Sequence, residues 1–281
     1  MPVFSKDRKK RSGDITTNNW TFSMVSAYLR CPKSFELQYV KGMEREYGSD
    51  LVEGVAHHDA LDEDNKNKYK EGRNLSLDRH IEIFADTFSY DAKHISIWNN
   101  GVNKNDVIRR GKGMIRSYKN HVDLIPGKDE DGATIEKFFQ FRLNITGEVW
   151  VTFQGFMDII GFLKSNTLYS IYDYKVTGKA KTIPQIMGSI QLDVYHVAAA
   201  KMGMGSIGSL RTGFISLVKS NQTVDVKDCL KSIKQINWSF RVIKDAISAA
   251  LKGCFPTCSP DNYLCSPVYC GYYRVCRGRM K

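Results

Sequence analysis

The sequence lacks several features that mark common classes of protein. No stretch of eighteen or more apolar residues occurs in its 281 residues, which argues against a membrane-spanning helix. A secretory signal has an apolar segment directly after its charged N-terminal region, and the charged N-terminal segment of this sequence is not followed by one. No glycine-rich loop of the Walker or Rossmann type is present, so nucleotide hydrolysis and hydride transfer have no support. We therefore expect a soluble, cytoplasmic protein with no membrane partner.

Internal repeats and low-complexity segments are also missing, and what remains is an ordinary globular composition with a strong positive charge. Hydrophobic residues make up 42% of the chain, enough for a sizeable buried core. Lysine and arginine number 41 against 30 aspartates and glutamates, a formal net charge of +11. Such an excess favours a polyanionic partner, and nucleic acid is the first candidate.

The seven cysteines are unevenly distributed. Cys31 and Cys229 stand alone, whereas five lie in the last 28 residues: Cys254, Cys258, Cys265, Cys270 and Cys276. An odd number of cysteines without a secretory signal argues against a disulfide framework and favours metal ligation. On their own, the clustered cysteines fit a zinc site or an iron–sulfur cluster equally well.

The first half of the chain is predicted to be helical. Apolar residues at steps of three and four predict a helix over residues 23–42 with Ser23 as its N-cap and Gly42 as its end, and this helix could break near Pro32. A second short helix is expected over 50–64, capped by Asp50, and two further helical segments are expected within 75–121.

The second half alternates between strand and helix patterns. Three consecutive antiparallel strands are expected, followed by a helix, a strand and an amphipathic helix. The expected ranges are 135–146, 149–163 and 168–175 for the three strands, then 183–204, 210–219 and 226–252. The sequence therefore predicts a mixed α/β fold in which a small sheet is flanked by helices.

Two of the predicted strands each carry an aspartate among apolar residues. Asp173 and Lys175 share one face of their strand, because side chains alternate across a strand. If the hairpin turn is centred between Ser165 and Asn166, partner numbers sum to 331 and Asp158 lies opposite Asp173. Like charges placed so closely are destabilising, and a shared Mg²⁺ or Mn²⁺ ion would relieve the repulsion. The alternative is that both are ordinary polar residues at strand ends.

Three further residues are expected near these carboxylates. His58 lies three residues from both Val55 and Leu61, so its ring is expected to point inward, where an imidazole could add a third metal ligand. The alternative is an ordinary core or surface histidine. Gln191 and Tyr195 lie one helical turn apart and share a face. Such a pair either orients water or phosphate or is ordinary packing.

The order of these motifs resembles a known family. CPKSFELQYV, GVAHHDALD, GFMDII, YDYK and QLDVY, followed by the cysteine cluster, resemble the RecB-like branch of the PD-(D/E)XK nuclease superfamily. The most similar members are stand-alone phage exonucleases and CRISPR-associated nucleases that carry an iron–sulfur cluster. The resemblance covers residues 23–276. It implies a Mg²⁺- or Mn²⁺-dependent deoxyribonuclease, most simply an exonuclease of DNA processing, recombination or repair.

The resemblance also implies a set of metal ligands. His58 follows Gly54 by four residues, as in the family's GxxxH motif, and would be a ligand. Asp158 and Asp173 would be the carboxylate ligands, and the backbone carbonyl of Tyr174 would complete the set. The sequence departs from most members in using aspartate, rather than glutamate, two residues before the motif lysine.

Other roles follow from the same resemblance. Lys175 would orient the attacking water and stabilise charge on the phosphate. Gln191 and Tyr195 would support the site and contact DNA, and Glu136 would have a supporting role. The departure from the usual cysteine spacing leaves Cys258 as an alternative ligand of the implied [4Fe-4S] cluster, whose ligands would be Cys31, Cys265, Cys270 and Cys276.

The implied domain layout is a single nuclease domain over 21–281 behind a basic, disordered tail over 1–20. A helical insertion would span about 64–130, the catalytic core about 133–252, and the cysteine-rich tail 254–281. DNA would be bound as a single strand or at duplex ends, with a helicase or recombinase as a further partner. The alternative is a non-catalytic, cluster-bearing protein that binds DNA or assists recombination.

Overall fold

The fold centres on a mixed β-sheet. The computed structural model describes residues 18–164 and 166–277, so residues 1–17 of the basic tail lie outside the described residues. Seven strands form the main sheet within the described part of the chain. They are β1 (Asn19–Trp20), β4 (Leu124–Pro126), β7 (Ile135–Thr146), β8 (Val149–Leu163), β9 (Asn166–Thr177), β10 (Arg211–Val218) and β11 (Thr223–Leu230). The mixed α/β architecture expected from the sequence is confirmed.

Helices precede the sheet, separate its strands and follow it. They are α2 (Phe22–Arg30), α3 (Pro32–Phe35), α4 (Ser49–Glu71), α5 (Leu77–Asp91), α6 (Lys104–His121), α7 (Ile183–Met187), α8 (Ile190–Lys201), α9 (Ile233–Leu251) and α10 (Tyr273–Arg277). Two small sheets pair β2 (Tyr47–Gly48) with β3 (Ile95–Ile97) and β5 (Lys128–Asp129) with β6 (Gly132–Ala133). No helix in the described ranges combines the length and apolar character needed to cross a membrane.

The sheet is built around the long strand β8. This strand pairs antiparallel with β4, β7 and β9, and parallel with β1. Ile159 lies opposite Tyr172 and Ile160 opposite Ile171, so partner numbers sum to 331, as the turn position predicted. On the far side of β9, strand β10 runs parallel to it, with Phe214 opposite Asp173. The antiparallel order β7, β8, β9 is therefore confirmed.

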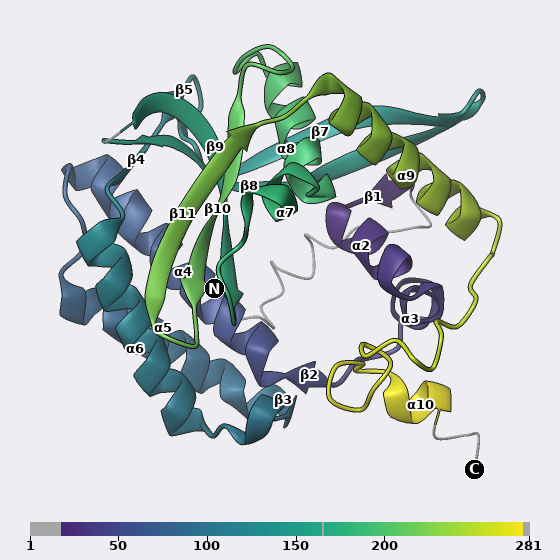
Figure 1. The fold of residues 1–281 in the computed structure, drawn as a ribbon, viewed down its shortest axis with the longest axis horizontal. Coiled ribbons are helices and arrows are strands. Elements are labelled where there is room, and N and C mark those ends of the chain that lie inside the picture. Colours follow the sequence, from purple (N-terminus) through teal and green to yellow (C-terminus); the bar gives the residue numbers. More distant parts are fainter. Residues whose placement is uncertain (1–17, 165, 278–281) are drawn as a thin grey trace.

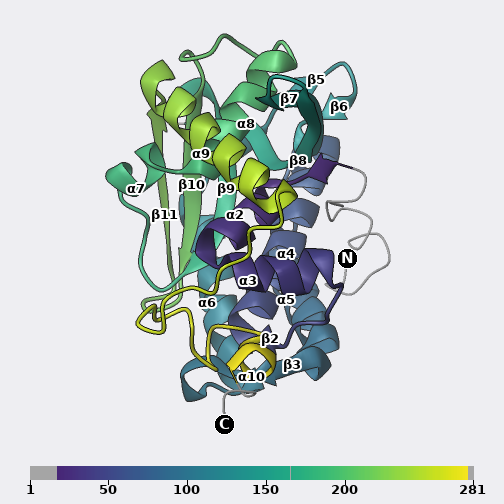
Figure 2. The same cartoon turned by 90° about the vertical axis from the view of Figure 1, so that its right-hand side faces the viewer.

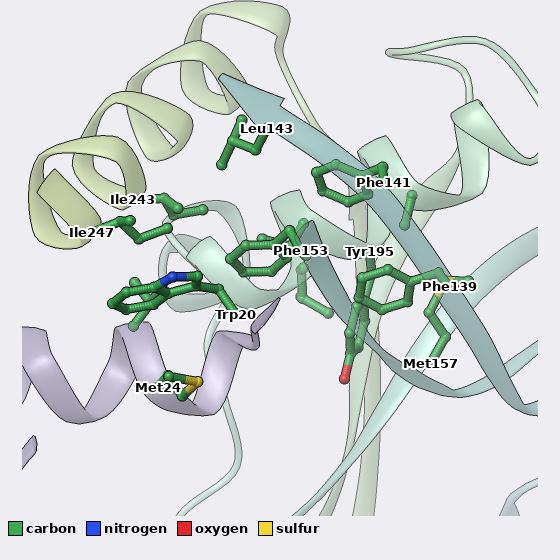
Figure 3. Close-up of a cluster of buried hydrophobic side chains, with 14 of the residues drawn as sticks. Trp20, Met24, Phe139, Phe141, Leu143, Phe153, Met157, Tyr195, Ile243 and Ile247 are labelled. Atoms are coloured by element: carbon green, nitrogen blue, oxygen red, sulfur yellow. The ribbon is translucent and has the colours of Figure 1, made fainter. Parts of the chain in front are cut away.

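Helices cover both faces of this sheet. Figures 1 and 2 show α2, α8 and α9 on one face, where they enclose one buried cluster with β7 and β8. Trp20, Phe141 and Phe153 are prominent in that cluster (Figure 3). On the other face, α4 and α6 pack against β9 and β10, and α5 packs outside them. The site described below lies where α4 and α8 meet the central strands.

Local capping differs from the sequence prediction at the first two helices. Thr21, not Ser23, is the N-cap of α2, because Thr21 is extended and its hydroxyl accepts from the backbone N–H of Met24 at 3.3 Å. Helix α4 begins after Gly48 rather than with Asp50 as its cap, and it runs for 23 residues to a left-handed Gly72. Asp50 lies in its first turn, where a carboxylate interacts favourably with the helix dipole.

Two later predictions were wrong. The helix expected over 183–204 is two helices, because Ser189 turns the chain and its hydroxyl caps α8. The helix expected over 226–252 begins only at Ile233, behind an N-cap at Ser232. Residues 223–230 form strand β11 instead, which pairs antiparallel with β10. This pairing outweighs the helical spacing of Val226 and Leu230.

Two buried histidines predict that the fold weakens in acid. His57 and His80 are fully buried. Burial lowers the pKa of His80 to about 4, with Asp64 opposing this and Lys119 reinforcing it, and burial also lowers the pKa of His57. An unfolded histidine titrates at about 6.5. Protons therefore bind preferentially to the unfolded chain between these values, and the free energy of unfolding falls as the pH falls through that window.

Urea denaturation tests this expectation. Between about pH 7 and pH 4, His80 alone is expected to remove up to about 3 kcal/mol of stability. A His80→Leu variant is expected to lose part of this pH dependence, whereas His121→Gln, at an exposed histidine, is expected to retain it. Equal pH dependence in His80→Leu and the unsubstituted protein would contradict the account.

Candidate functional site

Four elements bring the expected site residues together. Helix α4 supplies His58, strand β8 supplies Asp158, strand β9 supplies Asp173 and Lys175, and helix α8 supplies the Gln191 and Tyr195 pair. Both carboxylates are buried, with 7% of Asp158 and 1% of Asp173 exposed. The pairing of β8 with β9 ends at Ile159 and Tyr172, the residues next to the two aspartates, and the charge of Asp173 acts on Asp158. The site therefore concentrates negative charge inside the protein.

Asp158 is held by the neighbouring strand. Its Oδ2 accepts a hydrogen bond from the backbone N–H of Tyr174 at 2.9 Å. Burial raises the pKa of Asp158 well above its usual range, and the nearby charges of Asp173 and Glu136 raise it further. Ionised Asp158 is therefore costly without a cation beside it.

His58 faces the same carboxylate. Its Nε2 lies 2.9 Å from the carbonyl oxygen of Tyr174, and its Nδ1 lies 3.4 Å from Oδ2 of Asp158. Burial lowers the pKa of His58, so the ring is neutral near pH 7. If Nε2 carries the proton and donates a hydrogen bond to the carbonyl oxygen of Tyr174, the lone pair of Nδ1 faces Oδ2 of Asp158. A proton or a metal ion between these two acceptors would make the arrangement favourable.

Asp173 belongs to a second hydrogen-bond network. Its Oδ1 accepts from Nε2 of Gln191 at 2.6 Å and from the hydroxyl of Tyr195 at 3.3 Å. Its Oδ2 lies 2.6 Å from Nζ of Lys175, which also donates to Oε1 of Gln191 at 3.0 Å. This network holds the carboxylate in one orientation.

Lys175 is cationic in this environment. Burial acts to lower its pKa, but Asp173 and Asp158 outweigh that effect and the pKa of Lys175 is raised overall. Its side chain is 33% exposed, so the ammonium group also reaches solvent. A cation beside buried carboxylates and open to solvent can contact an anionic substrate.

The helix that carries Gln191 and Tyr195 is anchored in the core. The ring of Tyr195 packs edge-on against Phe139 at 6.0 Å, and Figure 3 shows it among the buried side chains. Ser189 is the N-cap of the helix, so the first turn, which carries Gln191, begins at a defined position. The predicted spacing of four residues therefore places both polar groups on Asp173, as their shared helix face required.

Tyr174 connects the site to the opposite face of the sheet. Its side chain is buried there, and its hydroxyl accepts from Nδ2 of Asn65 at 2.7 Å. Asn65 follows His58 by seven residues on α4, so both lie on one helix face. The sequence analysis missed Asn65, although this spacing of two turns was the available signal.

Glu136 is the third acidic residue near the site. The pairs Ile135 with Ile159 and Lys137 with Met157 set it opposite Asp158. Its φ of 48° is unusual for a non-glycine residue within a strand. Its charge contributes to the raised pKa of Asp158. Glu136 therefore acts on the expected metal ligands from the neighbouring strand.

The chemistry of these donors fits a divalent cation. Two carboxylates, one backbone carbonyl and one neutral imidazole are ligands that Mg²⁺ or Mn²⁺ accepts. Within residues 18–164 and 166–277, no three His, Cys, Asp or Glu side chains are already grouped around one metal position. The donors contact one another instead, through His58, Asp158 and Tyr174.

Five cysteines line a separate, small cavity. Its volume is about 50 Å³, and it lies between the junction of α2 with α3 and the C-terminal tail. The cysteines are Cys31, Cys258, Cys265, Cys270 and Cys276. Burial raises the pKa of Cys258 to about 12, and the nearby Cys31 and Cys265 raise it further. The four cysteines expected as cluster ligands thus line one cavity together with Cys258, although no three of them surround a single metal position within the described residues.

A mixed sheet between helices, with two neighbouring carboxylates and a lysine on adjacent strands, defines an α/β nuclease core. The family model described as the PD-(D/E)XK nuclease superfamily matches residues 19–277. The chain therefore belongs to the PD-(D/E)XK nuclease superfamily, as the motifs indicated. Members hydrolyse phosphodiester bonds and generally use divalent metals such as Mg²⁺.

One solved structure shows a similar fold. A crystal structure from Eubacterium rectale, described as a putative exonuclease, has a TM-score of 0.52 and 13% identity, covering 92% of this chain and 89% of its own. The crystal structure of SSO0001 has a TM-score of 0.44 and 13% identity, with coverages of 98% and 93%. The search of curated proteins found no match to the chain.

Proposed function

We propose that this nuclease is a Mg²⁺- or Mn²⁺-dependent deoxyribonuclease that degrades DNA from its ends. The observation that carries the proposal is the proximity of the buried Asp158 and Asp173, with Nζ of Lys175 2.6 Å from Oδ2 of Asp173. Two buried carboxylates and a cation at the solvent boundary suit a metal-assisted attack on an anionic ester. The net charge of +11 suits a polyanionic substrate.

Each side chain has a separate task in this mechanism. Asp158, Asp173, His58 and the carbonyl of Tyr174 would hold a divalent cation, which lowers the pKa of water and neutralises phosphate charge. Lys175 remains protonated, orients the attacking water and stabilises charge that develops on the phosphate oxygens. Gln191 and Tyr195 fix the orientation of Asp173 through its Oδ1.

We further propose that the cysteine cavity holds a [4Fe-4S] cluster bound by Cys31, Cys265, Cys270 and Cys276. Their thiols surround one cavity together with Cys258, and thiolates are the usual ligands of such clusters. The cluster would join α2 and α3 to the tail, and its role would be structural. Zinc in the same cavity is the alternative.

Metal titration with three DNA forms tests the catalytic proposal. End-labelled linear, nicked and closed circular DNA are incubated with the protein after chelation and then with added Mg²⁺ or Mn²⁺. We expect no cleavage after chelation, restored cleavage with either metal, and degradation of linear DNA but not of closed circles. Cleavage that persists in the chelator would contradict metal dependence, and equal cleavage of closed circles would contradict an exonuclease.

A further inference from the structure

A groove adjoins the proposed active site. One hollow of about 330 Å³ lies along β7 and β8, and a second of about 320 Å³ reaches Lys175. Phe22, Ser23, Tyr39 and Gln191 line both hollows. The two hollows adjoin at these residues, and we call them together the Tyr39 groove. The groove passes the residues that hold Asp173.

Unpaired positive charge lies at one end of the groove. Arg30 and Arg45 line the second hollow, and neither forms an ion pair with any described residue. Arg30 is exposed, and Nε of Arg45 is buried without a hydrogen-bond partner in the described part of the chain. Burial raises the pKa of the Tyr39 phenol, and the charges of Arg45 and Arg30, which line the same hollow, act against this rise. Two such cations near Lys175 favour the binding of a chain of phosphate groups.

Aromatic rings line the rest of the groove. Tyr39 is half-buried against Phe35, with ring centres 5.1 Å apart. At the other end, Phe156 packs on the exposed Phe138 at 5.2 Å. Cationic and aromatic side chains in one groove are the combination that binds single-stranded nucleic acid, because bases stack on the rings while phosphates pair with the cations.

The dimensions of the groove favour one strand over a duplex. Each hollow has the volume of a pocket for a small ligand, of the order of 300 Å³. Tyr39 and Phe156 line the hollows, where the face of an unstacked base can stack on an aromatic ring. A duplex keeps its bases paired and presents only its backbone to such a surface.

We propose that the Tyr39 groove binds a single strand of DNA, with Tyr39 stacking on a base and with Arg30 and Arg45 pairing with phosphates. This inference rests on the proposed deoxyribonuclease function, and it names the strand form that enters the site. The strand passes Gln191 and reaches Lys175, where its phosphate meets the carboxylates.

The cysteine-rich tail holds the wall that carries Arg45. The backbone N–H of Glu46 donates to the carbonyl of Gly271 at 3.0 Å, and the hydroxyl of Tyr272 donates to the carbonyl of Met43 at 3.0 Å. Residue 271 must be glycine at this approach, since an added Cβ would lie 2.4 Å from the carbonyl oxygen of Glu46. The second hollow also shares Arg30 and Arg45 with the cysteine cavity. The tail therefore supports the cationic end of the groove.

Equilibrium binding in EDTA tests the proposal without cleavage. Fluorescence anisotropy is recorded with a labelled oligothymidylate of about 20 nucleotides, the length that spans one or two strand-binding sites. A blunt duplex of equal length is the comparison. The variants are Tyr39→Leu, which keeps apolar bulk against Phe35, together with Arg30→Gln and Arg45→Gln. Matched controls are Tyr90→Leu and Arg109→Gln, at exposed positions on α5 and α6.

The variants are expected to separate stacking from charge. Tyr39→Leu should weaken binding of the single strand about tenfold with little change in salt dependence. Each arginine variant should reduce the slope of log K against log salt by about 0.7. Tyr39→Phe should bind like the unsubstituted protein, because it retains the ring.

Two results would overturn the proposal. One is single-strand binding by Tyr39→Leu, Arg30→Gln and Arg45→Gln equal to that of the two controls. The other is tighter binding of the duplex than of the single strand by the unsubstituted protein. Because these measurements need no hydrolysis, loss of the metal-dependent cleavage described above would refute the enzyme assignment while leaving the groove assignment standing.

Discussion

Replacing Asp173 with asparagine is expected to reduce DNA cleavage by about a thousandfold or more while the protein stays folded. Asparagine keeps the shape of the side chain and can still accept from Gln191 and Tyr195 through its carbonyl oxygen. It removes the charge that would hold a divalent cation and that keeps Lys175 in place. Initial rates on end-labelled linear DNA measure the effect.

Thermal unfolding of the same variant separates catalysis from stability. The Asp173→Asn variant would lose the ion pair with Lys175 but would also relieve the repulsion between two buried carboxylates, so the two effects oppose each other. We expect the unfolding temperature to change by only a few degrees. Asp123→Asn, at an exposed aspartate paired with Lys164, is the matched control and should cleave normally. Equal cleavage by Asp173→Asn and this control would refute the assignment.

Replacing Cys265 with serine is expected to remove an iron–sulfur chromophore and to destabilise the fold. Protein purified without oxygen should be brown, with absorption near about 400 nm, and the variant should be colourless. Loss of thiolate ligation between distant segments is expected to cost about 4 kcal/mol or more. For a chain of this size that lowers the unfolding temperature by about 10 °C.

Other cysteines supply the controls for this experiment. Cys254 is exposed and lies outside the cavity, so Cys254→Ser should keep both colour and stability. Cys258 lines the cavity and contacts Cys31 and Cys265, yet the proposed ligand set excludes it. Cys258→Ser should therefore retain the chromophore. A colourless unsubstituted protein containing zinc would contradict the iron–sulfur proposal, and loss of colour in Cys258→Ser would make Cys258 a ligand.

The site was predictable because its geometry follows from short-range rules. A turn position and the alternation of side chains suffice to place Asp158 near Asp173. A spacing of four residues suffices to place Gln191 and Tyr195 on one face of a helix. The family motifs supplied the remaining assignments. His58 required tertiary information, because only the packing of α4 against β9 brings its ring to the carbonyl of Tyr174.

Other parts of the fold could not be read from periodicity. In β11, Val226 and Leu230 are four residues apart and continue the helical spacing of the residues after them, whereas Val224 and Val226 alternate as in a strand. The antiparallel pairing with β10 shows that the strand forms. The break between α7 and α8 depends on Ser189 capping the second helix. The Tyr39 groove joins residues from α2, β8, β9 and α8, so no local pattern in the sequence indicates it.

The most direct test of the central claim is the position of a bound metal. Crystals soaked with Mn²⁺ would be measured at a wavelength where manganese scatters anomalously. The account predicts a single strong peak within coordination distance of the Asp158 and Asp173 carboxylates and of the Tyr174 carbonyl, and its loss in Asp173→Asn. A peak elsewhere in the protein, or one that persists in the variant, would contradict a metal site built by these residues.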